Sequence, residues 1–457
     1  MFGKVKKLYF VGIGGAGMSG IAEILYNLGY QVAGSDQSPS DITRYLQSLG
    51  VPIHAEHSGQ QVHEADVVVI SSAVGEDNPE VIAARQCGIP VIKRAEMLGE
   101  LMRLKYSIGV SGTHGKTTTT SMIGMILQHG GYQPTLIVGG IVAELGTGAS
   151  LGKGDYLVAE ADEYDRSFLS MYPAMAVVTN LESDHMDCYA DMDDLMNSFM
   201  KYMNQVPFYG AVVLSADDSR LMALRPRLTR RSVTFGFSEE ADYRAIAPTG
   251  QSSRSIFSVF HREELLGEIR LRVPGRHNVA NAMAAVAACR ELDVPFAAIA
   301  EGLQSFRGVG RRFEVIGEVN GVTVIDDYAH HPTEITATLS AAREVYSGRI
   351  IVIYQPHLFS RTRDFQVEFA RALATADVCL LVDIYPAREK PIEGITSEVI
   401  MRQAHQQGGG DFRYLGAMEK APVEAARIAR PGDTIITMGA GTITRIKQRL
   451  LMELTQV

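Results

Sequence analysis

The residues with the most specific chemistry in this 457-residue chain lie in a short glycine loop, Gly112-Thr113-His114-Gly115-Lys116-Thr117-Thr118. A strand pattern precedes the loop and a helical pattern follows it. Backbone N–H groups of such a loop surround phosphate oxygens, Lys116 offsets phosphate charge, and the Thr117 hydroxyl is a ligand for Mg²⁺. Only two residues separate the glycines, against four in the usual P-loop motif. We therefore expect a compact variant that binds ATP.

A second glycine loop begins at Gly12, after the strand pattern Leu8–Val11 and before a helical pattern that ends near Asn27. Its glycines permit a tight turn that brings backbone N–H groups close to a diphosphate at the start of the helix. An acidic residue after the next strand completes a dinucleotide fingerprint. The motif alone leaves NAD and a UDP-sugar open as ligands. The residues expected at this ligand are Gly12, Gly14, Gly15, Ala16, Gly17 and Asp36.

Polar side chains end two further strand patterns, and strand ends are where open α/β sheets bind ligands. Glu160 follows the strand pattern 156–159, and His185 follows the pattern 176–179. Because neighbouring parallel strands end at one edge, both residues should lie near Lys116. A carboxylate and an imidazole suit Mg²⁺ or Mn²⁺ beside ATP phosphates. We expect a metal site at Thr117, Glu160 and His185.

The last third of the chain contains two more polar clusters after strand patterns. Asp327 and His330 follow the pattern 322–325, and Arg361 follows the pattern 350–354. A surface loop would explain each cluster by itself. Because both occur at the edge where ligands bind, a functional site is the better interpretation.

The elements that must position these residues alternate between short β-rich runs and helical stretches. This alternation predicts an α/β fold with mostly parallel sheets and crossover helices. Three nucleotide-type units predict three domains, at 1–105, 106–313 and 314–457. The segment 241–273 is polar and alternating, which predicts an antiparallel hairpin insert.

Composition excludes several classes of function. The formal net charge is −9, which argues against nucleic acid or an anionic membrane as the main partner. The sequence contains no run of 18 apolar residues, so no membrane span is expected. The four cysteines lie about a hundred residues apart, a spacing that fits neither the common zinc patterns nor a disulfide framework. We expect a cytoplasmic protein.

Seven motifs in order along the chain resemble those of the Mur ligases of bacterial cell-wall synthesis. The resemblance covers almost the whole sequence. The motifs are Gly12–Gly20, Gly112–Thr118, Glu160–Glu163, Thr179–Asn180 with Asp184–His185, Pro274–Asn278, Gly310–Phe313 and Asp326–Pro332.

The resemblance implies a Rossmann-like N-terminal domain for a UDP-sugar, a central ATPase domain and a Rossmann-like C-terminal domain. It implies that ATP and Mg²⁺ are used to join L-alanine to UDP-N-acetylmuramate through an acyl phosphate. Lys116 and Thr117 would hold phosphates and Mg²⁺, and Glu160 and His185 would hold a second Mg²⁺. The remaining implied contacts are Asn278 and Asn281 at adenine, Arg312 at a phosphate, Asp327 at the ribose, and His330 and Arg361 at the amino acid.

Three alternatives follow from the same residues. The segment Glu160–Asp165 is also similar to a murein tripeptide ligase that uses the same sugar nucleotide, and Leu358 stands where many alanine-adding members have arginine. The segment Gln355–Asp364 still favours alanine. An NAD-dependent oxidoreductase would leave the loop at Gly112 unexplained. A non-catalytic nucleotide switch is the third alternative.

Overall fold

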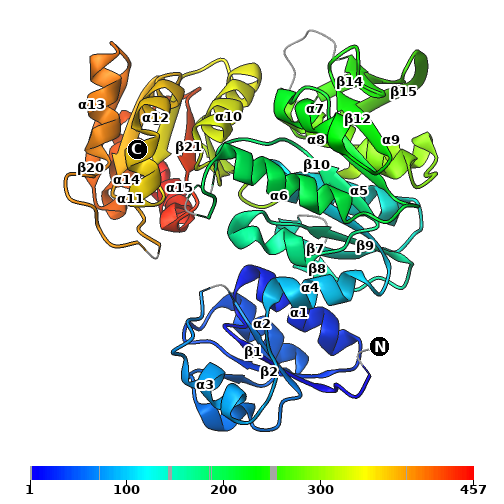
Figure 1. Cartoon of the computed structure of the whole chain (residues 1–457). Helices are drawn as coiled ribbons and strands as arrows, with labels where there is room; N and C mark the ends of the chain where they lie inside the picture. Colours follow the sequence, from blue (N-terminus) through cyan, green and yellow to red (C-terminus); the bar gives the residue numbers. More distant parts are fainter. Residues whose placement is uncertain are drawn as a thin grey trace. The chain divides into compact units, whose positions relative to one another are not determined.

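The computed structural model describes residues 3–71, 73–142, 147–184, 186, 188–246, 255–387 and 389–456. Their strands form three sheets, with helices between most successive strands (Figure 1). The α/β class with mostly parallel sheets is thereby confirmed. The chain divides into two compact units, one with the first two sheets and the other with the third. The domain boundaries near 105 and 313 stay predictions. Among the described residues, no helix is both long and apolar enough to cross a membrane.

The first sheet is parallel throughout and is covered on both faces. Phe10 packs in one core cluster with Ile21 of the first helix, whereas the next residue, Val11, packs in a second cluster with Val81. Successive side chains of a strand point to opposite faces, so helices must cover both. The strands, in spatial order, are β3 (Ile53–His54), β2 (Gln31–Ser35), β1 (Lys7–Val11), β4 (Val67–Ile70) and β5 (Val91–Lys93). The helices are α1 (Ala16–Asn27), α2 (Asp41–Leu49), η1 (Gly59–Val62), α3 (Pro79–Gln86) and α4 (Arg94–Met102).

The second sheet has ten strands, and the central ones are parallel. β13 and β14 pair antiparallel, as predicted for the insert at 241–273. The strands, in spatial order, are β15 (Glu264–Leu271), β14 (Ser255–His261), β13 (Tyr243–Ile246), β12 (Ser232–Gly236), β11 (Ala211–Ser215), β10 (Met175–Val178), β6 (Tyr106–Ser111), β9 (Tyr156–Glu160), β7 (Thr135–Val142) and β8 (Thr147–Ser150). The helices are α5 (Lys116–His129), η2 (Tyr164–Ser170), α6 (Met192–Asn204), α7 (Ser219–Leu224), η3 (Arg225–Arg227), α8 (Arg276–Arg290) and α9 (Phe296–Ser305).

The third sheet has one antiparallel edge strand, β16, and is otherwise parallel. Val352 and Ile353 of neighbouring positions again belong to different core clusters, so both faces are buried. The strands, in spatial order, are β16 (Glu314–Val319), β17 (Val322–Asp327), β21 (Thr434–Met438), β18 (Ile350–Tyr354), β19 (Val378–Val382) and β20 (Asp411–Gly416). The helices are α10 (Pro332–Val345), α11 (Phe359–Asp364), α12 (Gln366–Leu373), α13 (Glu398–Gln406), η4 (Met418–Lys420), α14 (Ala421–Ile428), η5 (Thr442–Ile446) and α15 (Lys447–Thr455).

Candidate functional site

The loop between β6 and α5 is the compact glycine loop predicted from the sequence. Gly112 has a φ of 130° and Gly115 a φ of 83°, conformations that favour glycine. A Cβ at Gly112 would lie 2.1 Å from Thr179 Oγ1, and one at Gly115 would lie 2.3 Å from Asn281 Oδ1. Both glycines are therefore required by the backbone conformation and by close packing. α5 begins directly after the loop, at Lys116.

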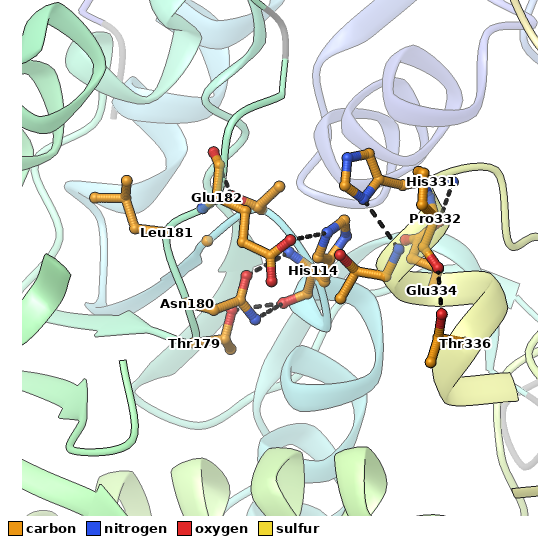
Figure 2. Close-up of polar contacts among 12 residues, drawn as sticks. His114, Thr179, Asn180, Leu181, Glu182, His331, Pro332, Glu334 and Thr336 are labelled. Atoms are coloured by element: carbon orange, nitrogen blue, oxygen red, sulfur yellow. Dashed lines mark hydrogen bonds and ion pairs between the residues drawn. The ribbon is translucent and has the colours of Figure 1, made fainter. Parts of the chain in front are cut away.

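Polar side chains that follow β10 hold the glycine loop in place (Figure 2). The His114 N–H donates to Asn180 Oδ1 at 2.8 Å, and the His114 carbonyl oxygen accepts from Thr179 Oγ1 at 2.6 Å and Asn180 Nδ2 at 3.0 Å. The Glu182 N–H donates to Thr113 Oγ1 at 2.8 Å. The sequence analysis placed Thr179 and Asn180 in a family motif but assigned them no role. Their position directly after a strand beside the loop was the available signal.

The ammonium group of Lys116 lies at this loop and is shielded from solvent. Nζ donates to the Gly112 carbonyl oxygen at 2.8 Å and to both carboxylate oxygens of Glu163 at 2.8 and 2.9 Å. Burial by itself would lower the pKa of Lys116, but the charges of Glu163 and Asp162 outweigh it and raise that pKa above its usual value. Lys116 is therefore charged at neutral pH. Glu163 is the closest acidic partner and was not predicted as a site residue.

Glu160, at the end of β9, reaches the first turn of α5. Its carboxylate accepts hydrogen bonds from the Gly139 N–H at 2.6 Å and from the Thr117 hydroxyl. Burial raises the pKa of Glu160, and these hydrogen bonds and the charge of Lys116 oppose the rise. Carboxylate and hydroxyl oxygens suit Mg²⁺, and a divalent cation would offset the cost of burying this charge. Thr117 and Glu160 of the predicted metal site thus lie together. His185 lies outside the described residues.

The two asparagines predicted at the adenine are both 7% exposed. Asn281, in α8, accepts a hydrogen bond from Thr119 Oγ1 at 3.4 Å and faces the backbone of Gly115. Asn278 Nδ2 donates to the Pro274 carbonyl oxygen at 2.6 Å, which fixes the chain where α8 begins. Asn281 thus belongs to the surroundings of the glycine loop. The adenine contacts stay predictions.

The first glycine loop joins β1 to α1, as predicted, and Asp36 shapes it. Asp36 Oδ2 accepts from the Gly14 N–H at 2.8 Å, and Oδ1 accepts from the Ser38 N–H at 2.9 Å. A Cβ at Gly14 would lie 2.8 Å from Asp36 Oδ2, so this approach depends on glycine. The carboxylate is directed at the loop backbone, whereas a dinucleotide fingerprint requires it at a ribose. A Cβ at Gly17 would lie 2.9 Å from Arg94 Nη1, which places a guanidinium group beside the first turn of α1.

A cavity of about 700 Å³ lies near this loop, within the size range of ligand sites. Val74 connects the cavity to the loop, because it lines the cavity and its Cγ2 would lie 3.8 Å from a Cβ at Gly12. His57 is in the lining as well, and its Nδ1 lies 2.7 Å from Oε2 of the buried Glu80. Glu80 also accepts hydrogen bonds from two hydroxyl groups, those of Tyr9 and Ser35. No motif in the sequence pointed to His57 or Glu80.

In the second unit, Asp327 ends β17 and is buried. Its carboxylate accepts from the Phe313 N–H at 2.8 Å and the Ala329 N–H at 2.7 Å. Burial raises the pKa of Asp327 to about 6, and the charge of Arg312 opposes the rise. The Arg312 guanidinium lies 5.0 Å from the centre of the Tyr328 ring. Asp327 and Arg312, both predicted to contact ATP, are thus brought together.

His330 is held at the start of α10 by Glu334. The His330 N–H donates to Glu334 Oε2 at 3.0 Å, and Nδ1 lies 3.1 Å from the same oxygen. Glu334 also belongs to the capping box of α10 (Figure 2). Arg361 lies in the short helix α11 and is 7% exposed. Leu358, just before that helix, has a φ of 71°. The amino-acid contacts of His330 and Arg361 stay predictions.

Three family models match successive parts of the chain. The model described as "Mur ligase family, catalytic domain" matches residues 7–106. The model for the Mur ligase middle domain matches residues 110–289, and the model described as "Mur ligase, glutamate ligase domain" matches residues 311–441. Together the three models account for most of the sequence.

Similar proteins match over nearly their whole length. A UDP-N-acetylmuramate–L-alanine ligase from Geotalea daltonii is 48% identical over 100% of both chains. One from Acidobacterium capsulatum is 51% identical over 99% of both. Among solved structures, a UDP-N-acetylmuramate–alanine ligase from Thermotoga maritima has a TM-score of 0.83 at 30% identity and covers 98% of this chain and 99% of its own. A murein peptide ligase from Psychrobacter arcticus has a TM-score of 0.73 at 26% identity and covers 99% of both.

Proposed function

The chain belongs to the Mur ligase family, and we propose that it uses ATP to join L-alanine to the lactyl carboxylate of UDP-N-acetylmuramate. The observation that carries this proposal is the meeting of Lys116, Thr117 and Glu160 at a glycine loop on the carboxyl edge of the second sheet. The choice of substrates is supported by full-length relatives of that name, at 48–51% identity.

The reaction must convert a carboxylate into a better acyl donor. A carboxylate oxygen attacks the γ-phosphorus of ATP, which releases ADP and leaves an acyl phosphate. The amine of L-alanine then adds to the carbonyl carbon, loses a proton, and the tetrahedral intermediate expels phosphate to form the amide. Charge accumulates on the transferred phosphoryl group, and the buried ammonium of Lys116 stabilises it.

The loop residues match the requirements of a nucleotide and a metal ion. The left-handed Gly115 opens α5, so the N-terminal end of the helix faces the phosphates. The Thr117 hydroxyl and the Glu160 carboxylate are the residues that would hold Mg²⁺. The ion would supply positive charge to the phosphate oxygens. In the second unit, Arg312 and Asp327 are the proposed ATP contacts, and Asn281 is proposed near the adenine.

The sugar nucleotide is assigned to the first glycine loop, at residues 12–17. Its diphosphate would lie at the N-terminal end of α1, where backbone N–H groups and the helix dipole favour negative charge. Asp36 contributes by fixing the N–H of Gly14, and Arg94 adds a positive charge beside Gly17. His330 and Arg361 of the second unit are the proposed contacts of the amino acid. We also propose that the reaction takes place in the cytoplasm.

The alternatives are less well supported. An oxidoreductase that uses NAD would need Asp36 at a ribose, but this carboxylate is bonded to the loop backbone. A murein peptide ligase of known structure has a similar fold at 26% identity, and the alanine ligase of known structure is 30% identical, so the preference for alanine rests on the full-length alanine ligases at 48–51% identity. A tripeptide also lacks a free carboxylate beside its amine, which Arg361 would otherwise bind through two parallel hydrogen bonds.

A phosphate-release assay tests the proposal. ATP, UDP-N-acetylmuramate and L-alanine are supplied together and then omitted one at a time, and the product mass is measured. We expect phosphate release only with all three substrates. Glycine and L-serine should be poorer, and loss of one methyl contact is worth about 1–3 kcal/mol. Efficient ligation of the muropeptide tripeptide with little ligation of alanine would contradict the proposal, as would nicotinamide reduction without ATP turnover.

A further inference from the structure

The acidic residue closest to the glycine-loop lysine is Glu163, which is 2% exposed. Both of its carboxylate oxygens lie within 2.9 Å of Lys116 Nζ. By comparison, Asp162 Oδ1 is 3.7 Å away, and that side chain is 40% exposed. A buried carboxylate that directs both oxygens at one ammonium is costly to place unless the pair is well formed.

The chain around Glu163 is fixed by contacts that do not involve Lys116. The Tyr189 hydroxyl donates to the Glu163 carbonyl oxygen at 2.5 Å. Asp165 and Arg166 follow with φ values of 53° and 54°, which are unfavourable for residues other than glycine. Arg166 is held there by the carboxylate of Asp194, at 2.5 and 3.0 Å, and by the Tyr189 ring at 4.8 Å. The position of Glu163 is therefore set by its own segment.

We propose that Glu163 is a positioning residue that holds the Lys116 ammonium at the mouth of the glycine loop, oriented for the phosphoryl group of ATP. The proposal rests on the proposed function, because it requires that the loop bind ATP. Glu163 does not touch substrate in this account, and it acts only through Lys116.

The geometry of the ammonium supports this role. Lys116 Nζ has three N–H donors. The Gly112 carbonyl oxygen takes one and the Glu163 carboxylate takes a second, at 2.8 Å each. The remaining contact, to the Thr113 carbonyl oxygen, is the longest at 3.4 Å, so it is the contact that a phosphate oxygen could replace. A free lysine side chain loses rotamer entropy when it is fixed, and here the side chain is already fixed before ATP binds.

The charge of Glu163 supports the same role. Its two carboxylate oxygens lie 2.8 and 2.9 Å from Lys116 Nζ, so the negative charge of Glu163 attracts the ammonium and keeps it at the loop.

The test compares Glu163→Gln with Asp165→Asn by steady-state kinetics with ATP, UDP-N-acetylmuramate and L-alanine. Glutamine keeps the size and one acceptor but removes the charge, so kcat should fall about 10- to 100-fold with the KM for ATP changed less than about threefold, because a misplaced lysine charge acts mainly on the transition state. Asp165→Asn removes an equal charge two residues away, and asparagine tolerates the left-handed conformation. Its kcat should stay within about twofold of the original.

A second measurement separates positioning from a general structural effect. Once Lys116→Ala has removed the ammonium, adding Glu163→Gln should cause no further loss of rate, because residues that act as a unit are not additive. An equal further loss in that background would overturn the proposal. So would an unchanged kcat with tighter ATP binding, which is the result expected if Glu163 competes with phosphate for Lys116. Turnover by the unsubstituted protein in the same assay tests the ligase function separately.

Discussion

α5 has a left-handed glycine on each side, and these two positions allow a matched experiment. Gly115 precedes the helix with a φ of 83°, and Gly131 follows it with a φ of 81°. Alanine in this conformation costs about 1–2 kcal/mol at either position. No atom lies within 4 Å of a Cβ at Gly131, whereas a Cβ at Gly115 would lie 2.3 Å from Asn281 Oδ1. Both substitutions should therefore lose the same stability through the backbone conformation, and only Gly115→Ala should lose more through a steric clash.

The additional cost at Gly115 can be worked from the side chain that must move. Asn281 is 7% exposed and accepts its hydrogen bond from Thr119. Leaving a buried polar group unpaired costs about 1–3 kcal/mol. Gly131→Ala should thus lower the free energy of unfolding by about 1–2 kcal/mol, and Gly115→Ala by about 2–5 kcal/mol.

Activity should separate the two variants more clearly than stability does. Gly115→Ala displaces the loop that we propose binds phosphate, and a displacement of about 1 Å at a reacting group can cost about 100-fold in rate. Gly131→Ala leaves that loop unchanged and should retain its rate within about twofold. Urea titration gives the stabilities, and phosphate release gives the rates. Equal losses of stability and of rate in the two variants would refute the steric argument.

Three further predictions follow from the charged residues. Lys116→Ala should lower the rate of ligation by about 10³-fold, measured as phosphate release from the folded variant. The variant lacks the positive charge that would stabilise the transferred phosphoryl group. Arg361→Lys should raise the KM for L-alanine without an equal fall in kcat, because lysine lacks the planar fork that binds a carboxylate with two hydrogen bonds. Burial raises the pKa of Asp327 from its usual 3.8 to about 6, so the folded protein binds a proton at Asp327 more tightly than the unfolded chain does. The stabilisation that this proton provides is fully present below about pH 4. That contribution is lost as the pH rises through about 6, and amounts to about 3 kcal/mol. Urea titrations between pH 4 and 7 should show this slope in the original protein but not in Asp327→Asn.

The parts of the fold that the sequence predicted correctly are those with strong local signals. Leu8–Val11 is an apolar run and Thr434–Thr437 consists of β-branched residues, and both lie within strands of the structure, β1 and β21. The segment with Gly112 was recognised because its glycines and lysine stand between a strand pattern and a helical pattern. Signals of this kind depend on neighbouring residues alone.

The partners of the acidic residues were not predictable in the same way. The run Glu160–Asp165 contains four carboxylates, and spacing could not tell which of them meets Lys116. The left-handed conformations of Asp165 and Arg166 change the direction of the chain there, and they depend on Asp194 and Tyr189, which come later in the sequence. Asp36 was predicted at a ligand from its distance to the glycines, and that distance could not show that its carboxylate accepts a hydrogen bond from the Gly14 N–H; its ligand contact stays a prediction.

The position of β21 in the third sheet affects how this unit can form during protein synthesis. β21 lies between β17 and β18 and pairs in parallel with both, although it follows β16 to β20 in the sequence. The pair β16–β17 and the group β18–β20 therefore have no strand to join them until residues 434–438 have been made. Until then, the edges of β17 and β18 that pair with β21 in the finished sheet have no partner. Unpaired strand edges of this kind can associate with other chains. This unit should depend on protection of its nascent chain until β21 emerges.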